Sequence, residues 1–144
     1  MSTRCQVKIK EFGVKNDREA VTLYHHCDGY PSNMVPLLAG AYQPDWQHGR
    51  IGKVASFVVA EDANGYDIEQ GHTLHPDIEW YYVLEVESTL DVTAVPTWIL
   101  TVYDVPGEAR TVRDMRKVFR GRIQDAVGLA NSMEDNEEVI WSRF

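Results

Sequence analysis

The sequence of 144 residues contains only two cysteines, Cys5 and Cys27. Two cysteines cannot build a disulfide framework, and we expect buried thiols, with a bridge between neighbouring strands only under oxidation. The chain also lacks any run of about 18 apolar residues, so we expect no membrane-spanning helix. Its first residues lack the apolar centre of a signal peptide. These absences predict a cytoplasmic protein.

Several sequence motifs of known chemistry are also missing. The chain contains no GxSxG nucleophile elbow, no GxxxxGK[ST] or GxGxxG phosphate loop and no HExxH zinc helix. We therefore expect no serine nucleophile, no ATP or dinucleotide binding and no cofactor.

Basic residues are scarce, and the net charge is −8. An acidic chain is poorly suited to a phosphate backbone, so nucleic-acid binding is disfavoured. The exception is the stretch from Arg110 to Arg122, which carries six basic residues and one acid, Asp114.

The apolar periodicity predicts five strands, three helices and a tail. Alternation indicates strands, and apolar residues at i, i+3 and i+4 indicate helices. We expect Ser32 or Asn33 to cap the first helix, with Pro36 in its first turn. The strands are predicted at 5–12, 21–27, 78–87, 90–95 and 98–105, the helices at 34–42, 51–63 and 111–133, a polar loop at 64–76 and the tail at 134–144.

This order, ββααβββα, predicts a single α+β domain over residues 1–144. Short turns between strands favour antiparallel pairing, so we expect a mainly antiparallel five-stranded sheet with the helices packed on one face.

The stretch LYHHCDGYP, residues 23–31, gathers the candidate site residues. Side chains two apart share a face of a strand, so His26 and Asp28 would project together. With His72 or His75 from the following polar loop, they could bind a divalent metal, with His26, Asp28 and His75 as the candidate ligands. The alternative is structural: Asp28 accepts backbone hydrogen bonds in a turn, Gly29 adopts a positive φ, and Tyr30 leads into the helix.

Two surfaces are candidates for partners. The strand WYYVLEVE has apolar residues on both faces, so Tyr81 and Val83, with Ile99 and Tyr103, predict a covered second face and a homodimer. The predicted last helix presents a basic face for an acidic partner, the chain's own EDNEE segment or RNA. That face comprises Arg113, Arg116, Lys117 and Arg120.

The residues His26-Cys27-Asp28-Gly29-Tyr30-Pro31 resemble the H-x-D-G-Y-P signature of small bacterial, archaeal and phage proteins of unknown role. The later Asp77-Ile78-Glu79-Trp80-Tyr81-Tyr82 resembles their D-[IV]-E-Y-x-Y strand. The resemblance spans residues 1–105 in outline and implies a compact intracellular or phage-encoded domain. It implies no catalytic residues.

Three functions therefore stand open. The first is a small cytoplasmic interaction or regulatory domain, dimeric and without catalysis of its own. The second is a metal-dependent or acid–base enzyme, hydrolase-like, that uses His26 and Asp28 with His72 or His75. The third is an RNA-contacting protein that uses the basic face.

Overall fold

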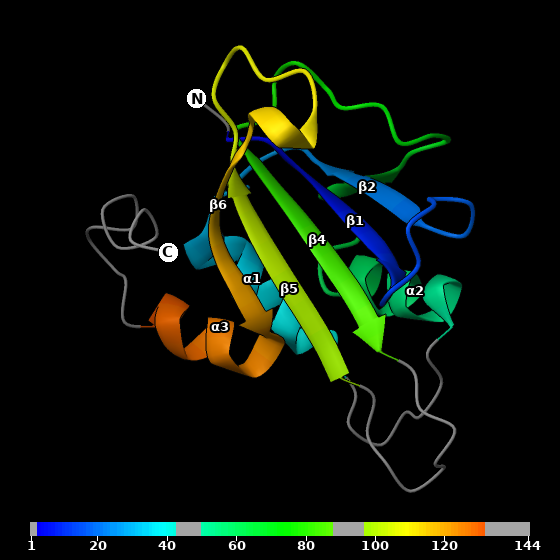
Figure 1. Cartoon of the computed structure of the whole chain (residues 1–144). Coiled ribbons are helices and arrows are strands. Elements are labelled where there is room, and N and C mark those ends of the chain that lie inside the picture. Colours follow the sequence, from blue (N-terminus) through cyan, green and yellow to red (C-terminus); the bar gives the residue numbers. More distant parts are fainter. Residues whose placement is uncertain (1–2, 43–49, 88–96, 132–144) are drawn as a thin grey trace, which may run out of the picture.

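The structure, a computed structural model, describes residues 3–42, 50–87 and 97–131 (Figure 1). These ranges contain six strands, three α-helices and one short 3₁₀ helix. In chain order they are β1 (Cys5–Glu11), β2 (Val21–His25), α1 (Pro31–Gly40), α2 (Ile51–Ala60), β3 (Tyr66–Ile68), β4 (Trp80–Glu87), β5 (Thr97–Asp104), η1 (Val112–Asp114), β6 (Arg116–Arg122) and α3 (Ile123–Asn131).

The strands form one sheet in the order β3-β2-β1-β4-β5-β6. The α+β class is confirmed, but the prediction of five mainly antiparallel strands is wrong. The sheet is mixed, because β4 pairs parallel with β1. In this register Cys5 lies opposite Trp80, and Ile9 lies opposite Leu84. The other neighbouring strands pair antiparallel.

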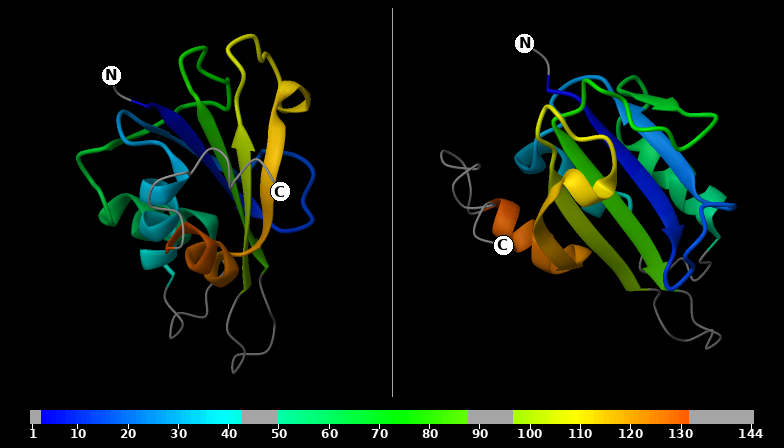
Figure 2. Two further views of the ribbon diagram at one scale, coloured as in Figure 1. Left: turned by 90° about the vertical axis from the view of Figure 1, so that its left-hand side faces the viewer. Right: turned by 45° about the horizontal axis from the view of Figure 1, so that its top comes forward.

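All three helices cover the same face of the sheet (Figure 2). The strands alternate as predicted, so every second side chain enters this core. Val7, Leu84 and Leu100 are fully buried there against Met34 of α1 and Val58 of α2. Helix packing on one face is therefore confirmed.

The predicted helix over 111–133 is wrong in its first half. Residues 116–122 form β6 along β5, and α3 begins only at Ile123. A register shift between Val102 and Tyr103 lets both Val118 and Phe119 face the core. Two adjacent buried residues break the alternation of a strand and imitate a helical pattern, which explains the error. The predicted strand 90–95 and the tail 134–144 lie outside the described residues.

Two further local predictions are wrong. The predicted loop 64–76 contains the three-residue strand β3. The α1 helix begins at Pro31 after Tyr30, which makes no side-chain cap, so neither Ser32 nor Asn33 is the cap. Proline suits the first helical position because its missing N–H has no partner there. Pro36 consequently lies inside the helix instead of in its first turn.

The second face of the sheet, here called the open face, is partly covered by the chain itself. Tyr81 is 1% exposed and packs in a small cluster with Tyr24, Ile78 and Met115. The burial of Tyr81 therefore needs no second subunit. The homodimer stays a prediction.

Candidate functional site

Residues 69–78 cross the open face above β1 and β2, and Gln6 fastens them there. The Gln6 side chain is fully buried at the centre of the sheet. Its Nε2 donates to the carbonyl oxygen of Thr73 at 3.0 Å, and its Oε1 accepts the backbone N–H of His75 at 3.0 Å. The nitrogen and the oxygen of one side-chain amide thus hold residues 69–78 in a fixed position. We call this segment the strap.

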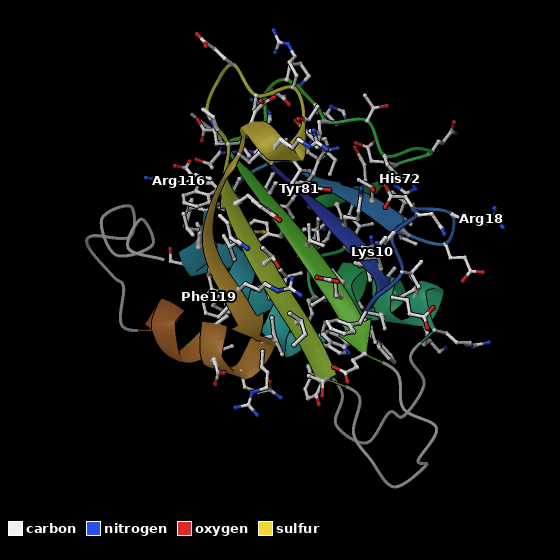
Figure 3. The ribbon with its side chains drawn as sticks, viewed as in Figure 1. Lys10, Arg18, His72, Tyr81, Arg116 and Phe119 are labelled. Carbon is white, nitrogen blue, oxygen red and sulfur yellow. The ribbon has the colours of Figure 1, made fainter. Side chains whose placement is uncertain are left out.

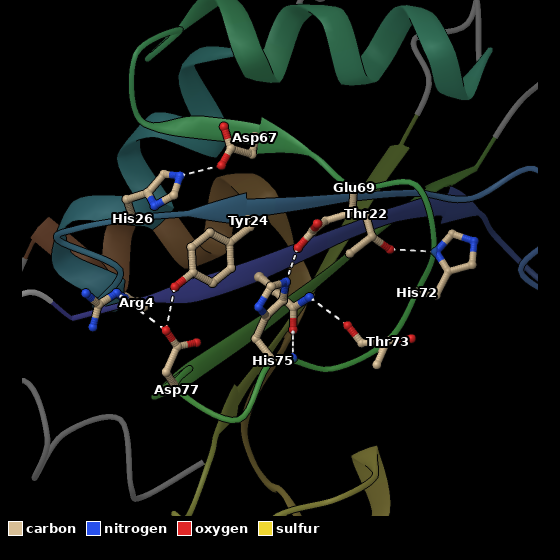
Figure 4. Close-up of polar contacts among 11 residues, drawn as sticks. Arg4, Thr22, Tyr24, His26, Asp67, Glu69, His72, Thr73, His75 and Asp77 are labelled. Carbon is tan, nitrogen blue, oxygen red and sulfur yellow. Dashed lines mark hydrogen bonds and ion pairs between the residues drawn. The ribbon is translucent and has the colours of Figure 1, made fainter.

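Tyr24 of β2 lies at the centre of the polar contacts beneath the strap (Figure 4). Its hydroxyl donates to the Asp77 carboxylate at 2.7 Å, and Arg4 lies 3.5 Å from the same oxygen. Burial and the hydrogen bond to Asp77 raise the pKa of Tyr24 to about 12. The phenol is therefore a hydrogen-bond donor at neutral pH.

Three imidazoles lie along this side of β2, and each has one ring nitrogen held by a neighbour. His26 Nε2 donates to Asp67 at 2.6 Å, and His75 Nε2 donates to Glu69. His72 Nδ1 lies 2.6 Å from the Thr22 hydroxyl. Side chains two residues apart lie on the same face of a strand. Thr22, Tyr24 and His26 have this spacing. We call His26, His72 and His75 the imidazole strip.

The strip is accessible as well as ordered. The His26 and His75 side chains are 50% and 40% exposed, and both rings contact Tyr24, with centroids 4.8 and 4.4 Å away. Within the described residues, the second nitrogen of each of the three rings accepts or donates no hydrogen bond. That nitrogen is available to a partner or a substrate.

The structure places His26, His72 and His75 on one face, and Asp28 lies outside this arrangement. The β2 strand ends at His25, and Asp28 has a φ of 53°. Its carbonyl oxygen accepts from Asn33, while its carboxylate makes no hydrogen bond among the described residues. The turn therefore depends on the Asp28 backbone, contrary to the expected side-chain bonds.

Gly29 has a different role from the one expected. Its φ is not positive; instead, a Cβ at this position would lie 2.9 Å from the Cys5 Cβ. Close packing against β1 therefore requires glycine here. Tyr30, the remaining candidate, is half-buried at the start of α1.

No three His, Cys, Asp or Glu side chains in the described ranges are grouped so that they could hold a metal ion. The predicted ligand set of His26, Asp28 and His75 is therefore not assembled. His26 and His75 are bound instead to separate acids on opposite sides of the Tyr24 ring (Figure 4).

A second polar cluster lies on the helix-covered face. The His25 side chain is 1% exposed, and its Nε2 donates to Asp62 at 2.7 Å. His25 Nδ1 and the Tyr66 hydroxyl are buried without hydrogen-bond partners among the described residues. Cys5 pairs with His25 across the strands, but burial raises the pKa of its thiol, so Cys5 is not an activated nucleophile.

The predicted basic helical face does not exist as such. Arg113 lies in η1, and Arg116, Lys117 and Arg120 lie on β6 at the edge of the sheet (Figure 3). Arg116 pairs with Asp104 at 2.6 Å, and Arg120 bonds Glu85 at 2.7 Å. These acids therefore pair with two of the four basic side chains.

A cavity of about 220 Å³ opens at the connection between β1 and β2. Two basic and two acidic side chains line the cavity, so its net charge favours neither anionic nor cationic ligands. Its lining residues are Lys10, Glu11, Val14, Asn16, Arg18, Glu19 and Ala20.

The residues that order the site carry no local sequence signal. Gln6 occupies a polar position of an alternating strand, which predicts exposure, and no local pattern marks Asp67 or Glu69 as histidine partners. Tyr24 and Arg4 likewise carried no signal.

No family model, curated protein or solved structure matches the chain. The described helices include none long and apolar enough to cross a membrane. Fold and site thus describe an α+β domain with a single mixed sheet and a strapped, histidine-bearing face.

Proposed function

We propose that the chain is a small cytoplasmic protein-interaction domain without catalysis of its own, and that the imidazole strip is its contact surface. The observation that carries the proposal is the fixed strap. Gln6 holds its backbone at two points, and an acid or the Thr22 hydroxyl holds one nitrogen of each imidazole. A surface ordered before binding loses little conformational entropy when a partner arrives.

The electrostatics of the strip also favour binding over catalysis. The Asp67 side chain is 64% exposed, and its histidine partner is 50% exposed. Electrostatic interactions between side chains that are so exposed to solvent are weak, whereas those in catalytic pairs are strengthened by the exclusion of water. A partner that covers the strip would supply that exclusion and strengthen the same hydrogen bonds.

The test uses the full chain as bait against a lysate, followed by titration of the purified partner. The His26→Ala/His75→Ala double variant should bind that partner at least tenfold more weakly. Ser56→Ala on α2 is the matched control, because Ser56 is exposed on a helix and bonds only its local Lys53 carbonyl. Equal affinities of the wild type and the double variant would refute the proposal.

An acid–base enzyme is the second candidate, and the pair of His75 and Glu69 favours it. Glu69 fixes one nitrogen of the ring and leaves the other for proton transfer, beside the Tyr24 ring. Hydrolysis of p-nitrophenyl acetate tests it. A kcat/KM that falls at least 100-fold in both His75→Ala and Glu69→Gln, and is unchanged in His72→Ala, would establish catalysis and overturn the first proposal.

A further inference from the structure

The strand β3 ends the sheet on the side of the imidazole strip, and its outer backbone groups are unpaired. Its pairing with β2 sets Tyr24 opposite Asp67. Ladder bonds on either side run from His26 N–H to the Gly65 carbonyl at 3.1 Å and from Glu69 N–H to the Thr22 carbonyl at 2.9 Å.

Hydrogen-bonded residues alternate along an antiparallel ladder. Gly65, Asp67 and Glu69 therefore point their backbone groups at β2, and Tyr66 and Ile68 point theirs away. Nothing else in the described ranges forms a hydrogen bond with those outward N–H and C=O groups. They offer a template for one more strand.

The side chains at this edge define what such a strand would carry. Ile68 is 68% exposed, whereas the other exposed large apolar side chains in the described ranges reach 42% at most. It lies in register with Leu23 on the helix-covered face, and Asp67 lies on the open face beside His26 (Figure 4). An added strand would meet an apolar side chain on one face and a carboxylate on the other.

The charge of the region is acidic. The sequence contains no lysine or arginine between Lys53 and Arg110. Around β3 it places four acids, Glu61, Asp62, Asp67 and Glu69. A cationic strand is complementary to this edge, whereas an acidic strand is repelled.

We infer that the β3 edge binds an extended segment of a partner protein by strand addition, and that this segment alternates apolar and basic residues. The inference rests on the proposed interaction function and names the chemistry of its partner. The basic residues would lie beside Asp67, and the apolar residues beside Ile68. A second copy of this chain is the weaker occupant. If two β3 strands pair antiparallel with Asp67 at the centre, Asp67 lies opposite Asp67, and with Ile68 at the centre it lies opposite Glu69, so like charges repel in both registers.

The probe is a seven-residue capped peptide that alternates valine and lysine, and the control peptide alternates valine and glutamate. Titration monitored by amide NMR should shift Tyr66 and Ile68, and hydrogen exchange at both amides should slow at least tenfold. The glutamate peptide should bind at least tenfold more weakly. Shifts confined to another strand or loop would overturn the inference.

Ile68→Pro is the decisive variant. The N–H of Ile68 points away from β2, so its removal by proline leaves the hydrogen bonds between β2 and β3 intact. It should weaken peptide binding at least tenfold, while Ile68→Val, which keeps the N–H, should bind as the wild type does. Core amide signals from β1 and β4 report whether the variant is folded. Unchanged binding by folded Ile68→Pro would overturn the inference.

Asp67→Lys provides a test that needs no proline. The variant should prefer the glutamate peptide, reversing the order of the two affinities, and an unreversed order would overturn the inference. Self-association of the wild type that Ile68→Pro abolishes would replace the partner with a second copy. If these tests fail but the His26→Ala/His75→Ala double variant still loses binding to its partner, only the strand addition is refuted. If the double variant binds the partner as the wild type does, the proposed function is refuted.

Discussion

The Gln6 amide oxygen accepts the backbone N–H of His75 at 3.0 Å, across 69 positions of the sequence. This contact and its companion at Thr73 join β1 to the strap. The position of two of the three candidate imidazoles therefore depends on one buried side chain that carries no charge.

Gln6→Leu should release the strap. The variant leaves the Thr73 carbonyl and the His75 N–H without their buried partner, so the free energy of unfolding should fall by about 2 kcal/mol. Urea denaturation measures this fall, and hydrogen exchange should accelerate at the His75 amide. Gln6→Glu, which still offers an acceptor to the His75 N–H, should keep that amide more protected than Gln6→Leu does. Equal exchange in wild type and Gln6→Leu would show that the strap does not need Gln6.

Gly65→Ala should disrupt the pair formed by the buried His25 and the partly exposed Asp62. A Cβ at Gly65 would lie 2.6 Å from His25 Nε2 and 2.5 Å from Asp62 Oδ2, so one of these groups must move. We expect a loss of about 2 kcal/mol in thermal or urea unfolding. Gly71→Ala is the matched control, because no atom lies within 4 Å of its Cβ position. A Gly65→Ala protein as stable as the control would contradict the packing described.

The stability of the protein should fall in alkali, partly through Tyr24. Its pKa is raised to about 12 in the folded state, above the value of 10.0 for a free phenol. The stabilising contribution is therefore complete below pH 10 and is lost as the pH rises towards 12. Urea unfolding across this range should show a shallower decline for Tyr24→Phe. Burial also raises the pKa values of Tyr66 and Tyr81, so some decline should persist.

Asp17 should contribute stability with the opposite pH dependence. A hydrogen bond from the Lys8 side chain at 2.8 Å, with the charges of Lys8 and Lys10, lowers the pKa of Asp17. The contribution is present above the ordinary aspartate pKa and is lost as the pH falls through the lowered value. Asp17→Asn should cost less than about 1 kcal/mol at pH 7, because the pair is partly exposed. The difference should vanish in strong acid; a constant difference would exclude the ion pair as its source.

The two cysteines should react very differently with Ellman's reagent. Cys27 is exposed, and Cys5 is fully buried with a raised pKa. We expect one thiol to react in the folded protein and the second only in denaturant. Cys27→Ser should remove the fast reaction. Two fast thiols in the native wild type would show that Cys5 is accessible.

The sequence predicts the parts of the fold in which a local pattern decides the structure. Alternation places Val7 and Leu84 in the core, and the apolar stripe of α2 is visible in Val54 and Val58. It does not predict β6, because adjacent burial of Val118 and Phe119 depends on a register shift against β5. Nor does it predict β3, whose three residues are too few to show a period.

The candidate site is predictable in its histidines and not in their partners. His26, His72 and His75 stand out as residue types, but the sequence does not show whether they converge. The acids that hold them, Asp67 and Glu69, are chosen by the pairing of β2 with β3 and by the path of the strap. Such contacts are set by tertiary structure, which no local pattern records.

The parallel pairing of β1 with β4 has a consequence for biosynthesis. During translation the hairpin of β1 and β2 leaves the ribosome well before Trp80, the partner of Cys5, has been made. Until then one edge of β1 lacks its neighbouring strand, and the backbone N–H and C=O groups along it have no strand partner. Closing so long a loop slows folding, and an unpaired strand edge favours aggregation of the nascent hairpin until β4 has joined β1.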